Sequence, residues 1–377
     1  MREIVIAGYA RSPFQPAHKG ALARVRPDEL AAQVVAALLE RTRVDPNAIE
    51  DVIVGCAFPE GEQGLNVARL IGFLAGMPER AAATTVNRFC GSSMQAVHTA
   101  AGAICMGAGE AFVCAGVESM TRVPMPGFNF SPHPGLYAVF PEAYATMGET
   151  AENLARRYAI PRSEQEAFAV ESHRRAAAAE AAFADEIVPV LTEAGERVER
   201  DGTIRRDTSL EALAALGPAF EEGGTVTAGT AAPLTDGAAA LLVTSEDFAR
   251  RHGLPVLARV RAIAVAGCPP DIMGLGPVHA TRKALARAGI TAEDLDIIEL
   301  NEAFAVQVLA CARELGLPWE RLNPTGGALA LGHPLGASGA RITGRAATLL
   351  KKCGGRFALA TMCVGGGQGI ATVLEAA

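Results

Sequence analysis

The chain has 377 residues, more than a single hydrophobic core usually serves, so two or three domains are expected. Half of its residues are hydrophobic and a fifth are charged, a balance typical of globular α/β proteins rather than disordered or fibrous ones. The formal net charge of −7 gives no support to binding of nucleic acid or of a membrane surface.

The beginning of the chain alternates between short β-rich runs and amphipathic helical stretches. Strands are predicted over residues 3–7 and 51–54, and helices over residues 27–41 and 66–75. Because such alternation usually produces a parallel or mixed sheet covered by helices, the pattern predicts an α/β fold.

A cysteine lies where the next strand is predicted to turn into a helix. Residues 84–97 read TTVNRFCGSSMQAV, strand-like at first and helical from Ser92, with Cys90 in the turn. Backbone N–H groups and the positive end of the helix dipole favour a thiolate there, and Gly91 permits close approach of another group. Cys90 is therefore a candidate nucleophile, although a small buried core cysteine is the commoner fate of this residue type.

The middle of the chain, residues 119–236, differs in composition and in periodicity from the two ends. Residues 120–144 are rich in Pro, Phe, Met and Gly and predict an extended loop. Helices are predicted over residues 150–157 and 163–183, the second with Ser163 as N-cap and Glu166 three residues later. We expect this segment to form an inserted lobe, of the kind that often helps to build a substrate site.

An internal repeat links the two ends of the chain. Residues 44–58 align without gaps to residues 290–304, and both copies read as a turn, a helix cap, a buried strand and a loop after an Ala/Leu/Arg-rich helix. Few residues are identical between the two copies, so the inference of a repeat depends on the similar order of apolar, polar and turn residues. The repeat predicts a duplicated fold of two similar halves.

Three further clusters follow in the second half. His333 lies in a Gly-rich stretch just before a helix predicted over residues 338–350, and a neutral imidazole there can deprotonate a thiol or stabilise an oxyanion. Cys363 ends a strand before Gly365, in a turn too near the C-terminus to belong to a dinucleotide-binding unit. Asn301 ends the repeated strand. Each cluster by itself also has a structural explanation: His333 fits an incidental surface histidine, the residues after Cys363 an ordinary glycine turn, and Asn301 a strand-to-helix cap.

Together, two cysteines, a histidine and an asparagine at strand ends form a nucleophile–base–acid set for acyl transfer. A Cys/His hydrolase needs no second thiol, whereas protonation of a carbon acid does call for another acid. These four clusters, around Cys90, Asn301, His333 and Cys363, closely resemble the signature motifs of the thiolase family, and the resemblance runs from end to end.

The resemblance implies a five-layered α-β-α-β-α fold of two βαβαβαββ halves with a loop domain inserted in the first. Residues 1–118, completed by 237–257, correspond to the N-terminal half, 119–236 to the inserted CoA-binding lobe, and 258–377 to the C-terminal half.

The resemblance also implies a role for each motif residue. Cys90 is expected to carry the acyl group. His333 is expected to activate it and, with a water held by Asn301, to bind the oxygen of the thioester enolate. Cys363 is expected to move the proton at the α-carbon, and the N–H groups of Cys90 and Gly365 to form the second oxyanion hole.

Coenzyme A is expected as a substrate along the inserted lobe, with no permanently bound cofactor and no metal. The positions that match its contacts are Arg205 (or Arg206) at the adenine, Met147, Ala219, Phe220, Ala228, Met273 and Phe304.

Two departures bear on the substrate. Ala232 stands where many thiolases have a serine touching the pantetheine, and Thr146 stands where acetoacetyl-CoA thiolases usually have histidine. Residues 86–96, 224–229 and 258–277 resemble 3-ketoacyl-CoA thiolases of fatty-acid β-oxidation, so thiolysis of 3-oxoacyl-CoA is expected. The alternatives are an acetoacetyl-CoA thiolase working in the condensing direction, a decarboxylating ketoacyl synthase, which Cys363 argues against, and a non-catalytic acyl-CoA binder.

Location and assembly are predicted as well. The N-terminus lacks the long apolar core of a signal peptide, no run is long enough for a membrane helix, and the eight cysteines form no CxxC pairs. A reduced, cytoplasmic protein is expected. The resemblance implies a homodimer, because residues 119–146 are short and proline-rich where tetrameric relatives add an arm, and it allows a β-oxidation hydratase/dehydrogenase partner.

Overall fold

The fold is built on one large mixed β-sheet, seen in the computed structural model, which describes residues 2–377. Its strands are β1 (Ile4–Arg11), β2 (Gln15–Pro16), β3 (Asp51–Gly55), β4 (Ala82–Val86), β5 (Ala111–Ser119), β8 (Thr235–Ser245), β9 (Ala258–Gly267), β10 (Ile297–Leu300), β11 (Phe357–Val364) and β12 (Gln368–Glu375). The order across the sheet is β10-β11-β12-β9-β1-β8-β5-β3-β4, with β2 beside β8.

The sheet consists of two parts whose strands match in order and direction, except that β4 of the first part has no counterpart strand in the second. In one part β4, β3 and β5 are parallel, and β8 and β1 follow antiparallel. In the other, β10 and β11 are parallel, and β12 and β9 follow antiparallel. The two parts meet only through β1 and β9, where Val5 pairs with Arg259 and Ile6 with Ala258.

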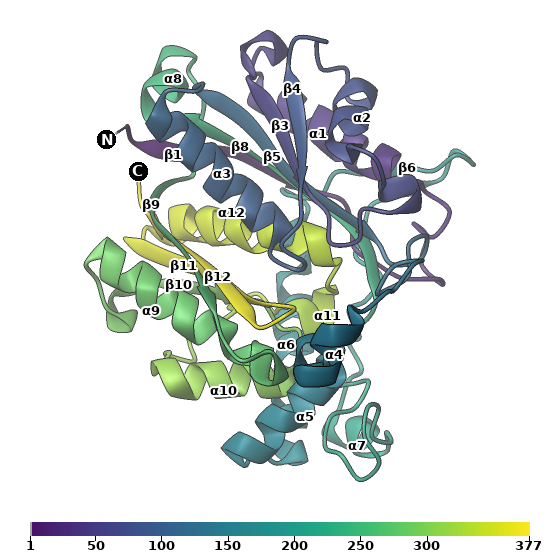
Figure 1. The fold of residues 1–377 in the computed structure, drawn as a ribbon. Helices are drawn as coiled ribbons and strands as arrows, with labels where there is room; N and C mark the ends of the chain where they lie inside the picture. The colour runs from purple at the N-terminus through teal and green to yellow at the C-terminus, as the bar shows by residue number, and fades with distance from the viewer. Residues whose placement is uncertain (1) are drawn as a thin grey trace.

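Helices complete a five-layered arrangement. Those that pack on the sheet or beside it are α1 (Pro27–Thr42), α2 (Val67–Leu74), α3 (Ser92–Met106), α9 (Gly276–Ala288), α10 (Ala305–Leu315) and α12 (Leu335–Cys353). Helices α1 and α2 cover the outer face of the first part, while α9, with α10 beside it, covers the outer face of the second. Between the two parts, α3 and α12 pack on each other and on both parts of the sheet (Figure 1). Strands covered on both faces read as continuous apolar runs, and every residue of β1, β5, β8 and β11 is buried.

The predicted duplication is confirmed at the level of single elements. The short helix η1 (Pro46–Ala48) and strand β3 recur as η5 (Ala292–Asp294) and β10, each beginning 246 residues later in the chain. The same spacing separates the ends of α1 and α9 and the starts of β5 and β11. The proposed division at residues 118, 236 and 257 stays a prediction; β5 extends to Ser119 and β8 begins at Thr235, so two of these boundaries fall at strand ends.

The central segment forms a mostly helical lobe. Its elements are α4 (Pro134–Val139), η3 (Pro141–Tyr144), α5 (Met147–Tyr158), α6 (Arg162–Phe183), β6 (Val190–Leu191), β7 (Arg197–Val198) and α7 (Leu210–Ala214). In Figure 1, α4, α5 and α7 lie at the end of the molecule opposite α8 (Glu246–Arg251).

Two local predictions in this lobe were wrong. Residues 120–144 are not all extended, because the side chain of His133 caps the first turn of α4 and Pro134 suits its first position. Ser163 is not an N-cap, because α6 already begins at Arg162 after the extended Pro161. A capping box does occur at the start of α5, where Thr146 and Glu149 bond reciprocally.

Candidate active site

The first turns of α3 and α12 lie side by side near the ends of β3 and β5, and glycines make this possible. A Cβ on Gly116 would lie 2.2 Å from the carbonyl oxygen of Gly336, and a Cβ on Gly339 would lie 2.4 Å from the nitrogen of Met94. The backbone N–H of Ala340 donates to Ser93 Oγ at 2.8 Å, which ties the two helices together. The turns that precede these helices, carrying Cys90 and His333, therefore face the same space.

That space is a small cavity of about 80 Å³. Its lining residues are Cys90, Met120, Met125, Met147, Ala232, Pro233, Leu234, Met273, Ala303, Phe304, His333, Leu335 and Cys363. The structure thus brings together both cysteines and the histidine that the sequence singled out, from three separate strand ends or turns.

The turn that presents Cys90 is held by polar side chains on both sides. Phe89 has a φ of 42°, an uncommon conformation for a residue with a side chain. Its N–H donates to Asn87 Oδ1 at 2.8 Å, and its carbonyl accepts from Ser92 Oγ at 2.6 Å. The N–H groups of Cys90 itself and of Gly365 point at the Cys90 sulfur. An oxyanion formed on a carbon attached to that sulfur would lie near the same two donors.

His333 is buried and held through both ring nitrogens. Its Nδ1 lies 2.6 Å from Ser338 Oγ, and its Nε2 lies 3.3 Å from Asn301 Nδ2. Its backbone N–H donates to Thr235 Oγ1 at 3.0 Å. If Nδ1 donates to Ser338, whose hydroxyl lies 3.3 Å from the carbonyl of Pro334, then Nε2 is the unprotonated nitrogen: it accepts from Asn301 Nδ2 at rest and is the atom that can take up a proton.

Both thiols and the imidazole are held in their neutral forms. Burial, together with the charge of Glu118, raises the pKa of Cys90 to about 12. Burial also raises the pKa of Cys363 well above its usual value, with a smaller effect of Cys90. Burial, aided by Arg341, lowers the pKa of His333 to about 3. The neutral imidazole agrees with expectation. The two N–H groups lower the pKa of Cys90, the direction predicted from the sequence, but burial and a nearby carboxylate outweigh them.

The residues predicted to contact coenzyme A are partly gathered at this cavity. Met147, Met273 and Phe304 line it, and the ring of Phe220 packs edge-on against Phe304 with centroids 5.8 Å apart. Ala219 precedes Phe220 and pairs with Val226 through its backbone N–H.

Two predicted coenzyme A contacts lie apart from these. Ala228 is exposed on the same loop. Arg205 is exposed, and its backbone N–H donates to His173 on α6 at 3.1 Å; the structure brings neither it nor Arg206 to the cavity. Ala232, one of the two departures, does line the cavity.

Sequence reasoning missed several residues around the cavity. Met120 and Met125 line it from the segment predicted to be a featureless loop. Ser338 was assigned only to the start of a helix; in the structure it lies in the first turn of α12, with its hydroxyl 2.6 Å from His333 Nδ1. Glu118 is the lone charged residue of the otherwise uncharged strand β5, and that contrast was the available signal.

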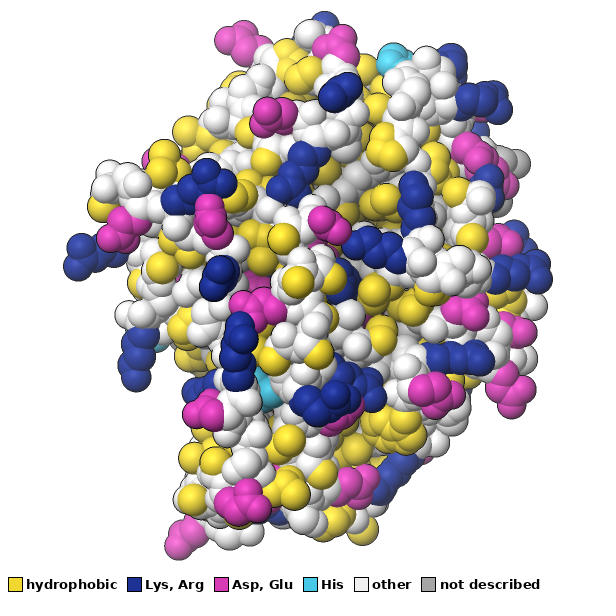
Figure 2. All heavy atoms as spheres, turned by 180° about the vertical axis from the view of Figure 1, so that it is seen from behind, with side chains coloured by type: hydrophobic (Ala, Val, Ile, Leu, Met, Phe, Trp, Pro, Cys, Tyr) yellow, Lys and Arg dark blue, Asp and Glu magenta, His cyan; other side chains and the backbone are white. Residues whose placement is uncertain are grey.

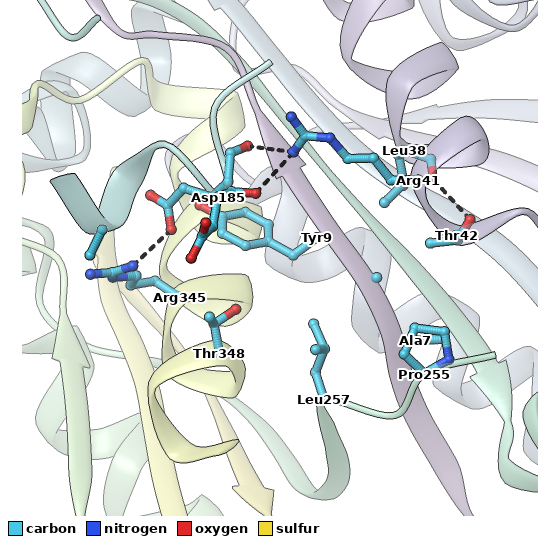
Figure 3. A pocket seen from close by; sticks show the side chains of 13 residues that line it. Ala7, Tyr9, Leu38, Arg41, Thr42, Asp185, Pro255, Leu257, Arg345 and Thr348 are labelled. Atoms are coloured by element: carbon cyan, nitrogen blue, oxygen red, sulfur yellow. Dashed lines mark hydrogen bonds and ion pairs between the residues drawn. The ribbon is translucent and has the colours of Figure 1, made fainter. Parts of the chain in front are cut away.

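A larger cavity of about 210 Å³ lies elsewhere and contains none of the predicted catalytic residues. Figure 3 shows Tyr9, Arg41 and Arg345 around it, with Arg41 donating to the backbone carbonyls of Asp185 and Glu186. Acidic and basic side chains are interspersed on the face seen in Figure 2. Within residues 2–377, no helix is long and apolar enough to cross a membrane, and no cluster of His, Cys, Asp and Glu suits a metal ion.

Comparison with known proteins identifies the class. Residues 4–247 match the family model "Thiolase, N-terminal domain" and residues 254–376 match "Thiolase, C-terminal domain". The chain belongs to the thiolase family and has its fold, and it is an acyltransferase of that family.

Individual relatives with named activities match the chain over its whole length. The chain is 52% identical to a 3-ketoacyl-CoA thiolase of Shewanella sp. (strain MR-7), over the whole of both chains, and 50% identical to one of Shewanella loihica, also over the whole of both. Human mitochondrial 3-ketoacyl-CoA thiolase superposes with a TM-score of 0.92 at 37% identity, covering 100% of this chain and 99% of that one. The Bacillus anthracis acetyl-CoA acetyltransferase gives a TM-score of 0.91 at 39% identity with the same coverage.

Proposed function

We propose that the protein is a 3-ketoacyl-CoA thiolase, which converts 3-oxoacyl-CoA and coenzyme A into acetyl-CoA and an acyl-CoA two carbons shorter. The observation that carries this proposal is the single cavity lined by Cys90, His333 and Cys363. Full-length relatives at 50–52% identity bear that name, and a human relative of that name has been solved with CoA.

The first half-reaction breaks the carbon–carbon bond. His333 Nε2 takes the proton of Cys90, and the thiolate attacks the 3-oxo carbon of the substrate. The resulting oxyanion is stabilised by the N–H groups of Cys90 and Gly365. As that intermediate collapses, the bond between C2 and C3 breaks, the acyl group stays on Cys90, and the enolate of acetyl-CoA departs.

The enolate must then be protonated. Its oxygen binds the N–H that His333 has just gained and a water held by Asn301, whose Oδ1 makes no other hydrogen bond. The thiol of Cys363 gives its proton to the enolate carbon, which releases acetyl-CoA. A neutral Cys363 is required for this step, and its raised pKa supports that state at neutral pH.

The second half-reaction restores the enzyme. The Cys363 thiolate takes the proton of the incoming coenzyme A thiol, and the new thiolate attacks the acyl-Cys90 thioester. Cys90 leaves as a thiolate and recovers its proton from the imidazolium of His333. Each catalytic group ends in the protonation state in which it began.

The covalent intermediate is the direct test. Incubation with acetyl-CoA is expected to add one acetyl group to the peptide that contains Cys90, and Cys90→Ser should abolish this label and reduce thiolysis by several orders of magnitude. Cys105→Ser, at an exposed cysteine, is the matched control and should keep both. Acetylation of another cysteine alone would contradict the assignment.

The substrate preference rests on the lining of the cavity. Met120, Met125, Met147 and Met273 all contribute, and flexible thioether side chains adapt readily to ligands of different length. Thr146 is occupied in capping α5. We therefore expect kcat/KM to rise or hold from four to six or eight carbons, since each buried methylene adds at most about 0.8 kcal/mol. A tenfold fall from four to six carbons would favour the alternative, an acetoacetyl-CoA thiolase (acetyl-CoA C-acetyltransferase); the Bacillus anthracis relative is named an acetyl-CoA acetyltransferase.

We further propose a cytoplasmic homodimer. The eight cysteines are free thiols, which fits a reducing compartment. Strand β4 is an edge strand, and the apolar side chains of Leu70, Phe73 and Leu74 on the adjacent α2 are exposed. An open strand edge beside exposed apolar side chains supports pairing with a second copy. A hydratase/dehydrogenase partner remains part of this proposal.

A further inference from the structure

One carboxylate close to the cavity is used by no step above. Glu118 lies at the end of β5 and is fully buried. Its Oε2 accepts from the backbone N–H groups of Ala57 at 2.8 Å and Gly336 at 2.9 Å. Its Oε1 accepts from the N–H of Phe58 at 3.2 Å and from Gln63 Nε2 at 2.8 Å, and the thiol of Cys56 lies 3.7 Å from it.

This carboxylate has no Lys, Arg or His ion-pair partner among the described residues. Burial raises the pKa of the Glu118 carboxyl, and the N–H donors that bond to its two oxygens oppose that shift. A proton on either oxygen would displace one of these donors, so the donor set fits the ionised form. A buried charge held only by dipoles is costly to maintain, which argues that it does more than fill space.

The contacts of Glu118 join the two catalytic turns. On one side it holds Ala57 and Phe58; the carbonyl of Ala57 accepts from Asn87 at 3.0 Å, and Phe58 packs on Phe89, directly before Cys90.

On the other side Glu118 holds Gly336, three residues after His333. A Cβ on Gly336 would lie 2.8 Å from the carboxylate and 2.9 Å from Cys56 Cα, so this approach is as close as the backbone allows.

The charge also acts on the nucleophile. The N–H groups of Cys90 and Gly365 favour a thiolate at Cys90, and the charge of Glu118, which accepts the backbone N–H of Gly336 in the first turn of α12, opposes it. The titratable groups around it are the thiols of Cys56 and Cys90, with His333 beyond Gly336.

We propose that Glu118 is a positioning residue that anchors the Cys90 and His333 turns to each other and keeps the Cys90 thiol protonated until substrate binds. The role rests on the proposed function, but it has a readout of its own. An uncharged thiol resists alkylation and oxidation in the free enzyme, and the proton is then transferred to His333 only when an acyl-CoA fills the cavity.

The test is alkylation of Cys90 by iodoacetamide at pH 8, followed on the Cys90 peptide by mass spectrometry in the full-length protein. Glu118→Gln removes the charge, and we expect Cys90 to be alkylated about tenfold faster, as a fall of one pKa unit implies. The matched control is Glu302→Gln. Glu302 is also fully buried and also holds a helix start, accepting from the N–H of Leu329 at 3.1 Å. This control should leave the Cys90 rate unchanged.

Glu118→Asp tests the placement of the carboxylate independently of its charge. It is also the variant to measure if Glu118→Gln does not fold. It keeps the charge but is one methylene too short to reach Ala57, Phe58 and Gly336 together. We expect a near wild-type alkylation rate with thiolysis kcat/KM reduced at least tenfold. The proposal is overturned if Glu118→Gln alkylates no faster than wild type, if Glu118→Asp alkylates as fast as Glu118→Gln, or if Glu118→Asp retains full thiolysis. Acetylation of Cys90 in the wild-type protein tests the proposed function separately.

Discussion

Replacing Ser338 by alanine removes the partner of His333 Nδ1. The contact of 2.6 Å is fully buried, and in the proposed reaction the ring becomes an imidazolium that must donate through Nδ1. A hydrogen bond to a charged group contributes about 1.5–3 kcal/mol, and without it Nδ1 has no hydrogen-bond acceptor in a buried site. This hydrogen-bond energy is lost from the charged transition state more than from the free enzyme. Since about 1.4 kcal/mol corresponds to a factor of ten, kcat/KM is predicted to fall 10- to 150-fold.

The assay is steady-state thiolysis of a six-carbon 3-oxoacyl-CoA, together with the rate of Cys90 acetylation by acetyl-CoA. Both should fall, because His333 takes part in each. Thr343→Ala is the matched control: its hydroxyl is equally buried on the same helix and donates to the carbonyl of Gly339 at 2.7 Å, away from His333. Ser338→Ala within threefold of wild type, or an equal loss in Thr343→Ala, would refute the reasoning.

Three further predictions concern the acid, the pH dependence of stability and the assembly. Cys363→Ala should still acetylate Cys90 while losing most solvent deuterium exchange into acetyl-CoA, because only exchange needs a carbon acid; near-normal exchange would contradict the role. His98, His173 and His333 have pKa values lowered to about 3, 4 and 3 by burial, so the unfolded chain binds more protons between those values and pH 6.5. Stability should therefore fall as pH drops below 6.5, and His98→Gln should flatten the fall in unfolding free energy by up to about 1.4 kcal/mol per pH unit, measured by denaturant titration; an unchanged slope would argue against a neutral buried His98. Light scattering should give a mass near twice 39.0 kDa, and a stable species near four times that mass would refute the dimer.

The sequence by itself determined the class of fold and the residues worth examining. Periodicity and turn chemistry are local, so helix α1 and strand β3 begin where predicted, and the repeat of residues 44–58 at 290–304 recurs as matching elements. Cys90, His333 and Cys363 stood out for the same reason, since glycine-rich turns at strand ends are visible in the order of residues. The short helix α4 was missed because a capping histidine and one proline weigh little against a loop-like composition.

Only the tertiary structure decided that these turns meet and what charge they carry. Cys90 and His333 face one cavity because α12 packs against α3 at Gly339 and against β5 where Gly336 meets Gly116, contacts between positions more than two hundred residues apart. The local pattern indicated only that the helix dipole and nearby N–H groups favour a thiolate at Cys90. The folded chain buries the sulfur near Glu118, and desolvation with a like charge outweighs a dipole, so the thiol stays protonated. Burial and charge at a site depend on what the rest of the chain packs around it, and no local pattern contains that information.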